Sequence, residues 1–227
     1  MITDICDFHA HILPGADHGS DSLKTSLRQL SLAKKFGVNR IIATPHFYPH
    51  EESIESFIKR RNAAYSLLEC ELTSDLPTVK LGAEVLICPK IEEIPSLEKL
   101  CIQGTRTLLI ELPFNDFSKE YFSSVKELIK HGYKVVLAHA ERYESDIIES
   151  LVKLGAVIQI NAYSITRFFK NCSIESWKNR KLIYAIGSDI HGADYFAYAK
   201  FAKARKKLSS YLLYLKTKSD EIWNEAE

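Results

Sequence analysis

A chain of 227 residues is long enough for one complete α/β domain, and its composition is that of an ordinary globular protein. Lys and Arg number 30 against 29 Asp and Glu, so the formal net charge is only +1. Because nucleic-acid binders carry a clear basic excess, we expect no nucleic-acid partner.

The cysteines and the first residues indicate a reducing location. Five scattered cysteines without a C-x-x-C pair argue against a disulfide framework and against a structural zinc site. Residues 1–4 have no basic segment leading into an apolar one, so no signal peptide is expected. No apolar run approaches the ~20 residues of a membrane-spanning helix. These features predict a cytoplasmic protein without a membrane span.

Short apolar runs alternate with amphipathic helical patterns along the whole sequence. The first helical pattern has Ser20 or Asp21 as its N-cap and ends at Gly37. Residues 51–75 are typical of one long outer helix. The predicted strands span residues 5–10, 40–44, 79–86, 107–112, 134–138, 156–160 and 182–187.

The order of these elements predicts an α/β fold. Continuous apolar strands, such as residues 108–110 and 135–137, suit a parallel sheet covered by helices on both faces. Repeated βα units in a chain of this size favour a closed or nearly closed (β/α) barrel, with an open doubly wound sheet as the main alternative. We found no linker, so residues 1–227 are expected to form a single domain.

Most of the predicted strands deliver an imidazole or a carboxylate near their carboxyl ends. Active sites of β/α barrels assemble at that end, so these side chains would meet in one cavity. The pair His9 and His11 has both rings on one face of its strand, since side chains alternate with period two. The candidate metal ligands are His9, His11, Asp17, His46, Glu84, Glu111, His139, Asp189 and His191.

Each of these residues, taken alone, also has a purely structural interpretation. The histidines of the first strand could bond backbone carbonyls, Asp189 and His191 could form a salt-bridged pair, and Asp17 could form a turn. Glu84 and Glu111 lie in apolar strands without a basic partner, where an unpaired carboxylate would be costly to bury. The coincidence over so many strands favours the metal site.

The number and the chemical type of these ligands limit how many metal ions, and which ones, the site could bind. Nine ligands exceed the roughly four to six that one transition-metal ion uses, so two or three ions are implied. Imidazole and carboxylate without thiolate suit Mn²⁺, Fe²⁺, Zn²⁺ or Mg²⁺.

Sites with several ions typically bridge a hydroxide and hold the oxygens of a displaced phosphoryl group. Arg142 follows His139 by three residues and could offer a bidentate fork to phosphate oxygens. The alternative is a surface ion pair with Glu141 or Glu144. The residues predicted to be catalytic are Arg142, Asp17, His46 and Glu111.

Several motifs occur together in a fixed order: Asp7-Phe8-His9-Ala10-His11, Ile42-Ala43-Thr44-Pro45-His46, Gly82-Ala83-Glu84, Leu109-Ile110-Glu111-Leu112-Pro113-Phe114, Leu137-Ala138-His139-Ala140-Glu141-Arg142-Tyr143, Gln159-Ile160-Asn161-Ala162 and Gly187-Ser188-Asp189-Ile190-His191. In this combination the sequence resembles the polymerase and histidinol phosphatase (PHP) superfamily. Within it, the sequence is most similar to the manganese-dependent bacterial protein-tyrosine phosphatases of capsular and exopolysaccharide synthesis.

The resemblance implies a distorted seven-stranded TIM-like barrel, the PHP fold, with a trinuclear centre activated by manganese. It implies one ion held by His9, His11, Glu84 and Asp189, a second by Glu84, Glu111 and His139, and a third by Asp17, His46 and His191. Arg142 matches the family arginine that contacts phosphate. The implied substrate is the phosphorylated tyrosine cluster of a partner kinase.

The sequence departs from the family pattern at a few positions. His18 stands where the family usually has a second Asp, and Ala140 stands where Pro is common. The segment after His191 lacks the arginine that often follows this motif.

The expected function is therefore hydrolysis of phosphate monoesters, above all phosphotyrosine on a polysaccharide-synthesis kinase, by attack of a metal-bridging hydroxide. A PHP phosphatase of a small metabolite, such as histidinol phosphate or a sugar phosphate, is the first alternative. An amidohydrolase-type metal hydrolase is the second, although no strand-end lysine is present to bridge its ions. A binding or scaffold protein on a retained PHP fold is the non-enzymatic alternative.

The last helical stretch is rich in basic residues and tyrosines, and the basic residues are Lys200, Lys203, Arg205, Lys206 and Lys207. This pattern is typical of a solvated face over an aromatic packing face. The alternative is a contact surface for an anionic kinase tail or for another subunit. The oligomeric state stays open.

Overall fold

The computed structural model describes residues 6–114, 118–167 and 172–224 of the chain. Every strand in this part pairs in parallel with its neighbours. The strands are β1 (Cys6–Ala10), β2 (Arg40–Ala43), β3 (His46–Phe47), β4 (Thr78–Leu81), β5 (Glu84–Leu86), β6 (Thr107–Glu111), β7 (Lys134–Leu137), β8 (Val157–Asn161) and β9 (Ile183–Gly187).

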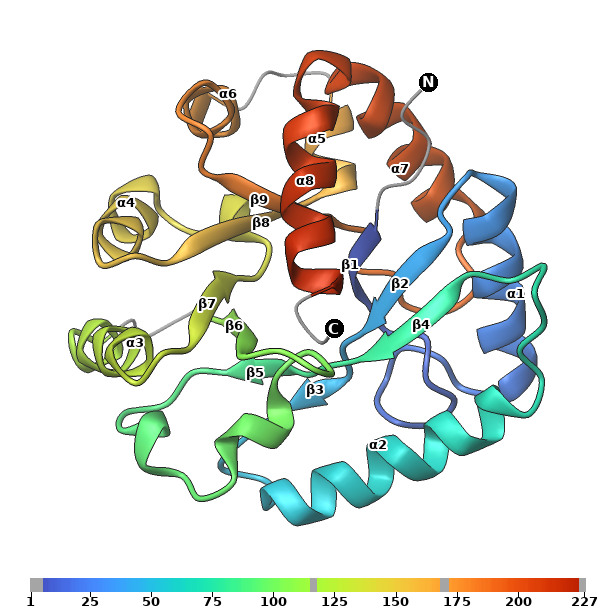
Figure 1. The fold of residues 1–227 in the computed structure, drawn as a ribbon, viewed down its shortest axis with the longest axis horizontal. Coiled ribbons are helices and arrows are strands. Elements are labelled where there is room, and N and C mark those ends of the chain that lie inside the picture. Colours follow the sequence, from blue (N-terminus) through green and yellow to red (C-terminus); the bar gives the residue numbers. More distant parts are fainter. Residues whose placement is uncertain (1–5, 115–117, 168–171, 225–227) are drawn as a thin grey trace.

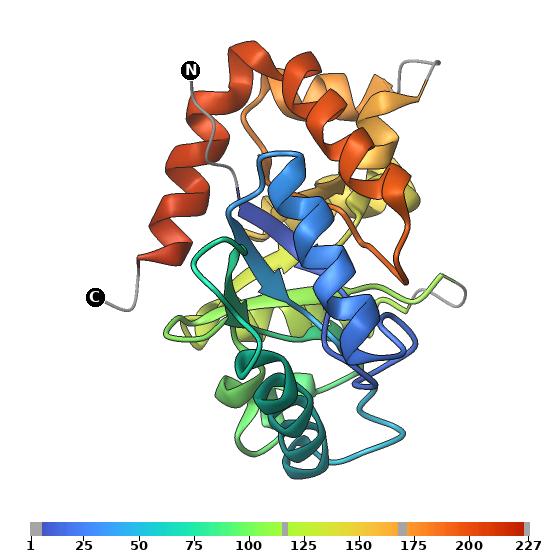
Figure 2. The ribbon, with the colours of Figure 1, turned by 90° about the vertical axis from the view of Figure 1, so that its right-hand side faces the viewer.

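Helices cover the strands from outside and form most of the longer connections between them. The α-helices are α1 (Leu23–Lys35), α2 (Ile54–Glu69), α3 (Glu120–Lys130), α4 (Ser145–Lys153), α5 (Ala162–Thr166), α6 (Cys172–Asn179), α7 (Tyr195–Lys207) and α8 (Leu212–Trp223). Short 3-10 turns are η1 (Ile91–Glu93), η2 (Leu97–Leu100), η3 (Ala140–Arg142) and η4 (Ser209–Tyr211). Figure 1 shows the strands in the centre of the molecule with α1, α2, α3 and α4 around them. In Figure 2, α2 lies on one side of the strands, and α7 and α8 lie on the other.

The strands form two sheets, one of three strands in the order β1-β2-β4 and one of six in the order β3-β5-β6-β7-β8-β9. The prediction of parallel strands covered by helices is thus confirmed. Because the described strands divide into two sheets, closure into one seven-stranded barrel stays a prediction.

Two breaks in the strands explain the division into two sheets, and one of them interrupts a predicted strand. The strand predicted for residues 79–86 breaks at Gly82 and Ala83, and β2 is separated from β3 by Thr44 and Pro45. Proline has no N–H for a sheet ladder, so a strand with central pairing cannot run through Pro45. The two breaks lie side by side, since Gly82 N donates to Ala43 O over 2.8 Å.

The end of β1 is also bonded to the segment that follows β9. Asp189 N donates to His9 O over 2.8 Å, and His11 N donates to Ile190 O over 3.3 Å. The first and last strands of the described chain therefore meet at their carboxyl ends. This contact brings together histidines and a carboxylate that are far apart in sequence.

The helix boundaries follow their caps. α1 begins after Ser22, whose Oγ accepts from Thr25 N, so the cap is one or two residues later than predicted. α2 is shorter than the predicted 51–75, because Ser53 caps it by accepting from Ser56 N and it ends at Glu69. The predicted strand boundaries agree to within about two residues, and residue 5 lies outside the described part of the chain.

Over the same described ranges, no helix combines the length and the apolar character that crossing a bilayer requires.

Arg61 of α2 donates hydrogen bonds to the backbone at the strand break before Glu84. Its side chain is buried, and its Nη1 donates to Gly82 O over 3.1 Å and to Lys99 O over 3.3 Å. These bonds satisfy a carbonyl at the break between β4 and β5, where the strand ladder cannot supply a donor for every group.

We therefore expect Arg61→Met to lower the free energy of unfolding by about 3 kcal/mol, since buried hydrogen bonds from a charged donor are lost. Chemical denaturation of the metal-free protein measures this effect. Lys59→Met, at an exposed position of the same helix, is the matched control and should change stability little. Equal effects of the two substitutions would contradict the role assigned to Arg61.

Candidate metal centre

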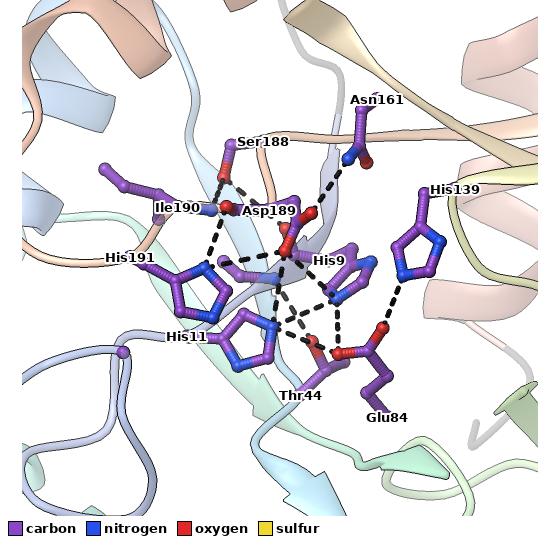
Figure 3. A network of polar contacts seen from close by, with 12 residues as sticks. His9, His11, Thr44, Glu84, His139, Asn161, Ser188, Asp189, Ile190 and His191 are labelled. Atoms are coloured by element: carbon purple, nitrogen blue, oxygen red, sulfur yellow. Dashed lines mark hydrogen bonds and ion pairs between the residues drawn. The ribbon is translucent and has the colours of Figure 1, made fainter. Parts of the chain in front are cut away.

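Most of the predicted ligands lie at or just after the carboxyl ends of strands, whereas His46 and Glu84 begin the short strands β3 and β5 just after the two breaks. His9 is in β1, His46 in β3, Glu84 begins β5 and Glu111 ends β6. Sheet register places His46 opposite Glu84. The remaining candidates, in the loops just after β1, β7 and β9, are His11, Asp17, His139, Asp189 and His191. Figure 3 shows the rings of His9, His11, His139 and His191 around the carboxylates of Glu84 and Asp189.

Glu84 is at the centre of this cluster. Its Oε2 lies 3.1 Å from His9 Nε2, 3.2 Å from His11 Nε2 and 3.0 Å from His46 Nδ1. Its Oε1 lies 2.8 Å from His139 Nε2. Burial opposes ionisation of Glu84, but the charges and hydrogen bonds of the surrounding histidines hold its pKa well below the usual range. Glu84 is therefore arranged as a carboxylate that several cations could share.

Asp189 and Glu111 extend the cluster on two sides. Asp189 Oδ1 lies 3.7 Å from His9 Nε2 and 3.5 Å from His11 Nε2. Glu111 Oε1 lies 3.4 Å from His139 Nε2. The ligand sets expected for two of the ions are thus brought together.

Ligand atoms within 4.8 Å of one another define three overlapping groups in the described part of the chain. They are His11, His46 and His191; His9, His11 and Glu84; and His46, Glu84 and Glu111. Because the groups overlap, cations bound here would share ligands.

Asp17 contacts the cluster from its side. Its Oδ2 accepts from His11 Nδ1 over 2.7 Å and from His46 N over 3.0 Å, and its Oδ1 accepts from Gly19 N. Burial opposes ionisation, but the hydrogen bond and charge of His11 hold the pKa of Asp17 below its usual range. In this geometry Asp17 orients His11, and its predicted role as a direct ligand of a third ion stays a prediction.

Hydrogen bonds to the second ring nitrogen orient the ligand histidines. His9 Nδ1 lies 3.1 Å from Gln159 Oε1, and His191 Nδ1 lies 3.1 Å from the carbonyl oxygen of Asp189. When Nδ1 donates to such an oxygen, the lone pair of Nε2 is directed at the cluster, as metal ligation requires.

The pKa values follow from this crowding of acids and bases. Burial lowers the pKa of His139, but hydrogen bonds to Glu111 and Glu84 outweigh it and raise the pKa to about 9. Burial lowers the pKa of His46 to about 4. A cluster of carboxylates at this depth requires positive charge, which protons supply on some of the imidazoles and which bound cations would supply instead.

Buried polar atoms without a hydrogen bond test whether metal ions fit these residues. His191 Nε2 is buried without a hydrogen-bond partner among the described residues, and His46 Nδ1 and Glu84 Oε2 form no hydrogen bond although they lie 3.0 Å apart. Buried polar atoms are rarely left unpaired, and nitrogen and carboxylate oxygen are suitable ligands for divalent transition metals. The residues therefore fit a group of divalent cations.

The backbone is strained at two candidate ligands. His139 and Asp189 have φ angles of 31° and 51°, in the left-handed region that residues with a side chain rarely adopt. Such conformations cost about 1–3 kcal/mol and are typical of functional sites. The chain is also tightly packed just before Asp189. A side chain at position 187 would place its Cβ 2.6 Å from the Cβ of His9, which is too close for two carbon atoms, so only glycine fits there.

Gln159 was assigned no role from its sequence position, although it lies in one of the family motifs. Its Oε1 accepts from His139 N over 2.8 Å as well as facing His9 Nδ1, and its Nε2 donates to Asn161 Oδ1. Asn161 Nδ2 in turn donates to Asp189 Oδ2 over 2.9 Å. A buried polar pair in an otherwise apolar strand was the available signal.

We expect Gln159→Leu to weaken divalent-metal binding by about 10–100-fold, because the acceptor that orients His9 is lost. Titration of the metal-free protein with Mn²⁺, followed by calorimetry, measures the affinity. Gln103→Leu makes the same chemical change at an exposed site and is the control. Unchanged Mn²⁺ affinity in a folded Gln159→Leu variant would rule out the orienting role.

Comparisons with known proteins agree with the fold and give the family of the chain. A family model described as capsular polysaccharide synthesis, CpsB/CapC, matches residues 5–211. The tyrosine-protein phosphatase YwqE of Bacillus subtilis (strain 168) is 28% identical over 234 residues, which cover 95% of this chain and 90% of that protein. The tyrosine-protein phosphatase CpsB of Streptococcus pneumoniae is 25% identical over 208 residues, 83% of each chain.

A solved structure supports the same assignment at the level of the fold. It comes from work on YwqE and CpsB as metal-dependent tyrosine phosphatases, and it matches with a TM-score of 0.77 at 24% identity. The match covers 98% of this chain and 96% of that one. Since the family model spans nearly the whole sequence, this chain belongs to the CpsB/CapC family of capsular polysaccharide synthesis.

Proposed function

We propose that this protein is a metal-dependent phosphatase that hydrolyses phosphotyrosine on a tyrosine kinase of capsule or exopolysaccharide synthesis. The observation that carries the proposal is the buried Glu84 carboxylate, with both oxygens within 3.2 Å of histidine nitrogens. The names of the relatives YwqE and CpsB support the same substrate class. A cytoplasmic location belongs to the same proposal.

The proposal includes a single PHP-type domain over residues 1–227, in which the two sheets together form the distorted seven-stranded barrel. The backbone bonds from the segment after β9 to β1 support this arrangement. So do the two-residue breaks themselves, since Thr44 and Pro45 join β2 to β3, and Gly82 and Ala83 join β4 to β5, from the three-stranded sheet to the six-stranded one.

Two or three divalent ions would be held here, with Mn²⁺ as the first choice and Fe²⁺, Zn²⁺ or Mg²⁺ as alternatives. The proposed ligand sets are His9, His11, Glu84 and Asp189; Glu84, Glu111 and His139; and Asp17, His46 and His191. When bound, such ions supply Lewis-acid activation of water and neutralise charge on the phosphoryl oxygens.

Arg142 is the proposed phosphate contact. It pairs with Asp189 Oδ2, and 41% of its side chain is exposed, so its guanidinium lies at the open edge of the cluster. A guanidinium at this position can donate two parallel bonds to the non-bridging oxygens of a phosphate and stabilise their negative charge during transfer. Asp189 restrains the guanidinium before substrate binds.

An exposed aromatic ring beside Arg142 favours an aryl phosphate over a small metabolite. Phe114 is 62% exposed, its ring stacks with His139 at 6.2 Å and with Tyr143 at 5.6 Å between centroids, and Arg142 Cζ lies 6.0 Å from it. A large apolar side chain left exposed next to a polar site is typical of a binding surface. The ring of a phosphotyrosine could stack there while its phosphate reaches the cluster.

The direct test of the proposed function is turnover of a phosphotyrosine peptide by protein loaded with Mn²⁺. Chelation should abolish turnover, and Glu111→Gln and His9→Ala should do the same while lowering the metal content of soluble protein. Since the proposed chemistry needs no thiolate, Cys→Ser variants should stay active. Turnover by protein that elemental analysis shows to be free of metal would contradict the proposal.

The role of Phe114 has its own test. We expect Phe114→Ala to raise KM for a phosphotyrosine peptide by about three- to tenfold, because one aromatic contact is lost, and to leave KM for a small alkyl phosphate nearly unchanged. Phe196→Ala removes another ring of similar exposure, 65%, and is the matched control. Equal effects on both substrates would favour the small-metabolite phosphatase.

A further inference from the structure

A cavity of about 600 Å³ opens beside the metal centre. On one side it is lined by Arg142, Asp189 and His191 of the centre, and on the other side by Tyr163, Arg167 and Lys200. Its size is that of a pocket for a small ligand or a few side chains. A substrate with its phosphate at the cluster would therefore have this cavity next to it.

Two cations lie over a single aromatic ring in the outer part of the cavity. Lys200 Nζ is 4.2 Å from the centroid of Tyr163, and Arg167 Cζ is 5.0 Å from it. Each contact is a favourable cation–π interaction, but two like charges at one ring also repel each other. An anion placed between them would remove this repulsion and gain two ion pairs.

The backbone that carries Arg167 is fixed to α7. Lys207 Nζ donates to Ile165 O over 3.1 Å and to Arg167 O over 3.4 Å. Lys200 lies two turns earlier on the same helix. The segment with Tyr163 and Arg167 is therefore held against the helix with Lys200, so the three side chains form one site.

The acidic residues of the cavity do not neutralise these two cations. Glu141 accepts from Ser164 Oγ and from Asn161 N, Asp194 caps α7 by accepting from Phe196 N, and Asp189 pairs with Arg142. Over the ranges that the structure describes, no carboxylate forms an ion pair with Arg167 or Lys200. Their charges are available to a ligand.

We propose that this cavity is a subsite for an acidic side chain of the peptide that carries the phosphotyrosine. The proposal rests on the proposed function, because the phosphate must occupy the metal centre while the neighbouring carboxylate reaches Tyr163, Arg167 and Lys200. It adds a sequence preference to the phosphatase, namely glutamate or aspartate close to the phosphotyrosine.

The experiment uses the full chain loaded with Mn²⁺ and two peptides that differ only in glutamate or glutamine next to the phosphorylated position. A non-hydrolysable phosphonate in place of the phosphotyrosine allows Kd to be measured by fluorescence anisotropy. We expect the glutamate peptide to bind about tenfold more tightly, since two partly exposed ion pairs together give a factor of this size. The preference should fall with added salt.

Variants assign the preference to the cavity. In Arg167→Gln/Lys200→Gln the ratio of the two Kd values should approach one. Lys203→Gln, an exposed position of α7 outside the cavity, should keep the wild-type ratio. Equal binding of both peptides by the wild-type protein would overturn the subsite, as would loss of the preference in Lys203→Gln or its retention in the double variant.

Hydrolysis of the matching phosphotyrosine peptides separates this inference from the proposed function. A binding preference without turnover of either peptide would refute the phosphatase assignment and support the acidic subsite. Turnover of both peptides at the same kcat/KM, with equal Kd values for the phosphonates, would support the phosphatase and refute the subsite. Failure of both phosphonates to bind would count against the subsite and the phosphatase assignment alike.

Discussion

A buried carboxylate surrounded by imidazoles is the constraint on which the rest of this structure depends. Glu84 is 1% exposed, so its charge can persist only with positive partners on both oxygens. His46 is brought to it by strand register, His9 and His11 by the adjoining sheet, and His139 by the turn after β7. The interruption of two strands, which divides the sheets, is the backbone arrangement that allows these groups to meet.

Much of the centre was predictable because strand ends are readable in the sequence. A hydrophobic run followed by His or Asp marks a carboxyl end, and parallel strands bring such ends to one edge. This reasoning identified Glu111 and most of the histidines, whereas Glu84 was identified as an unpaired carboxylate inside an apolar strand. The structure brings Glu84, Glu111 and His139 within ion-pair distance of one another. Helix limits were predictable only to a few residues, since capping by Ser22 and Ser53 depends on backbone angles.

The rest of the site depends on loops, whose spatial neighbours a sequence does not reveal. Arg167 follows a five-residue helix, and Lys200 lies on the next long helix, α7, so only the folded chain shows that both approach Tyr163. Gln159 was equally hidden, because one buried amide in a strand gives no indication of which imidazole it contacts. The break at Gly82 and Ala83 was missed for another reason, since an apolar run of residues does not show where a strand changes its pairing partner.

The contact between β1 and the segment after β9 determines how late in synthesis the metal centre can form. Residues from His9 to Asp189 must be present before either oxygen of that aspartate can approach the first strand. Contacts at such sequence separation form late in folding, since a long loop must close first. During synthesis on the ribosome, a nascent chain would therefore carry scattered, low-affinity histidines until nearly all of it has emerged. Cations that bind the assembled centre would then stabilise only chains whose synthesis is nearly complete.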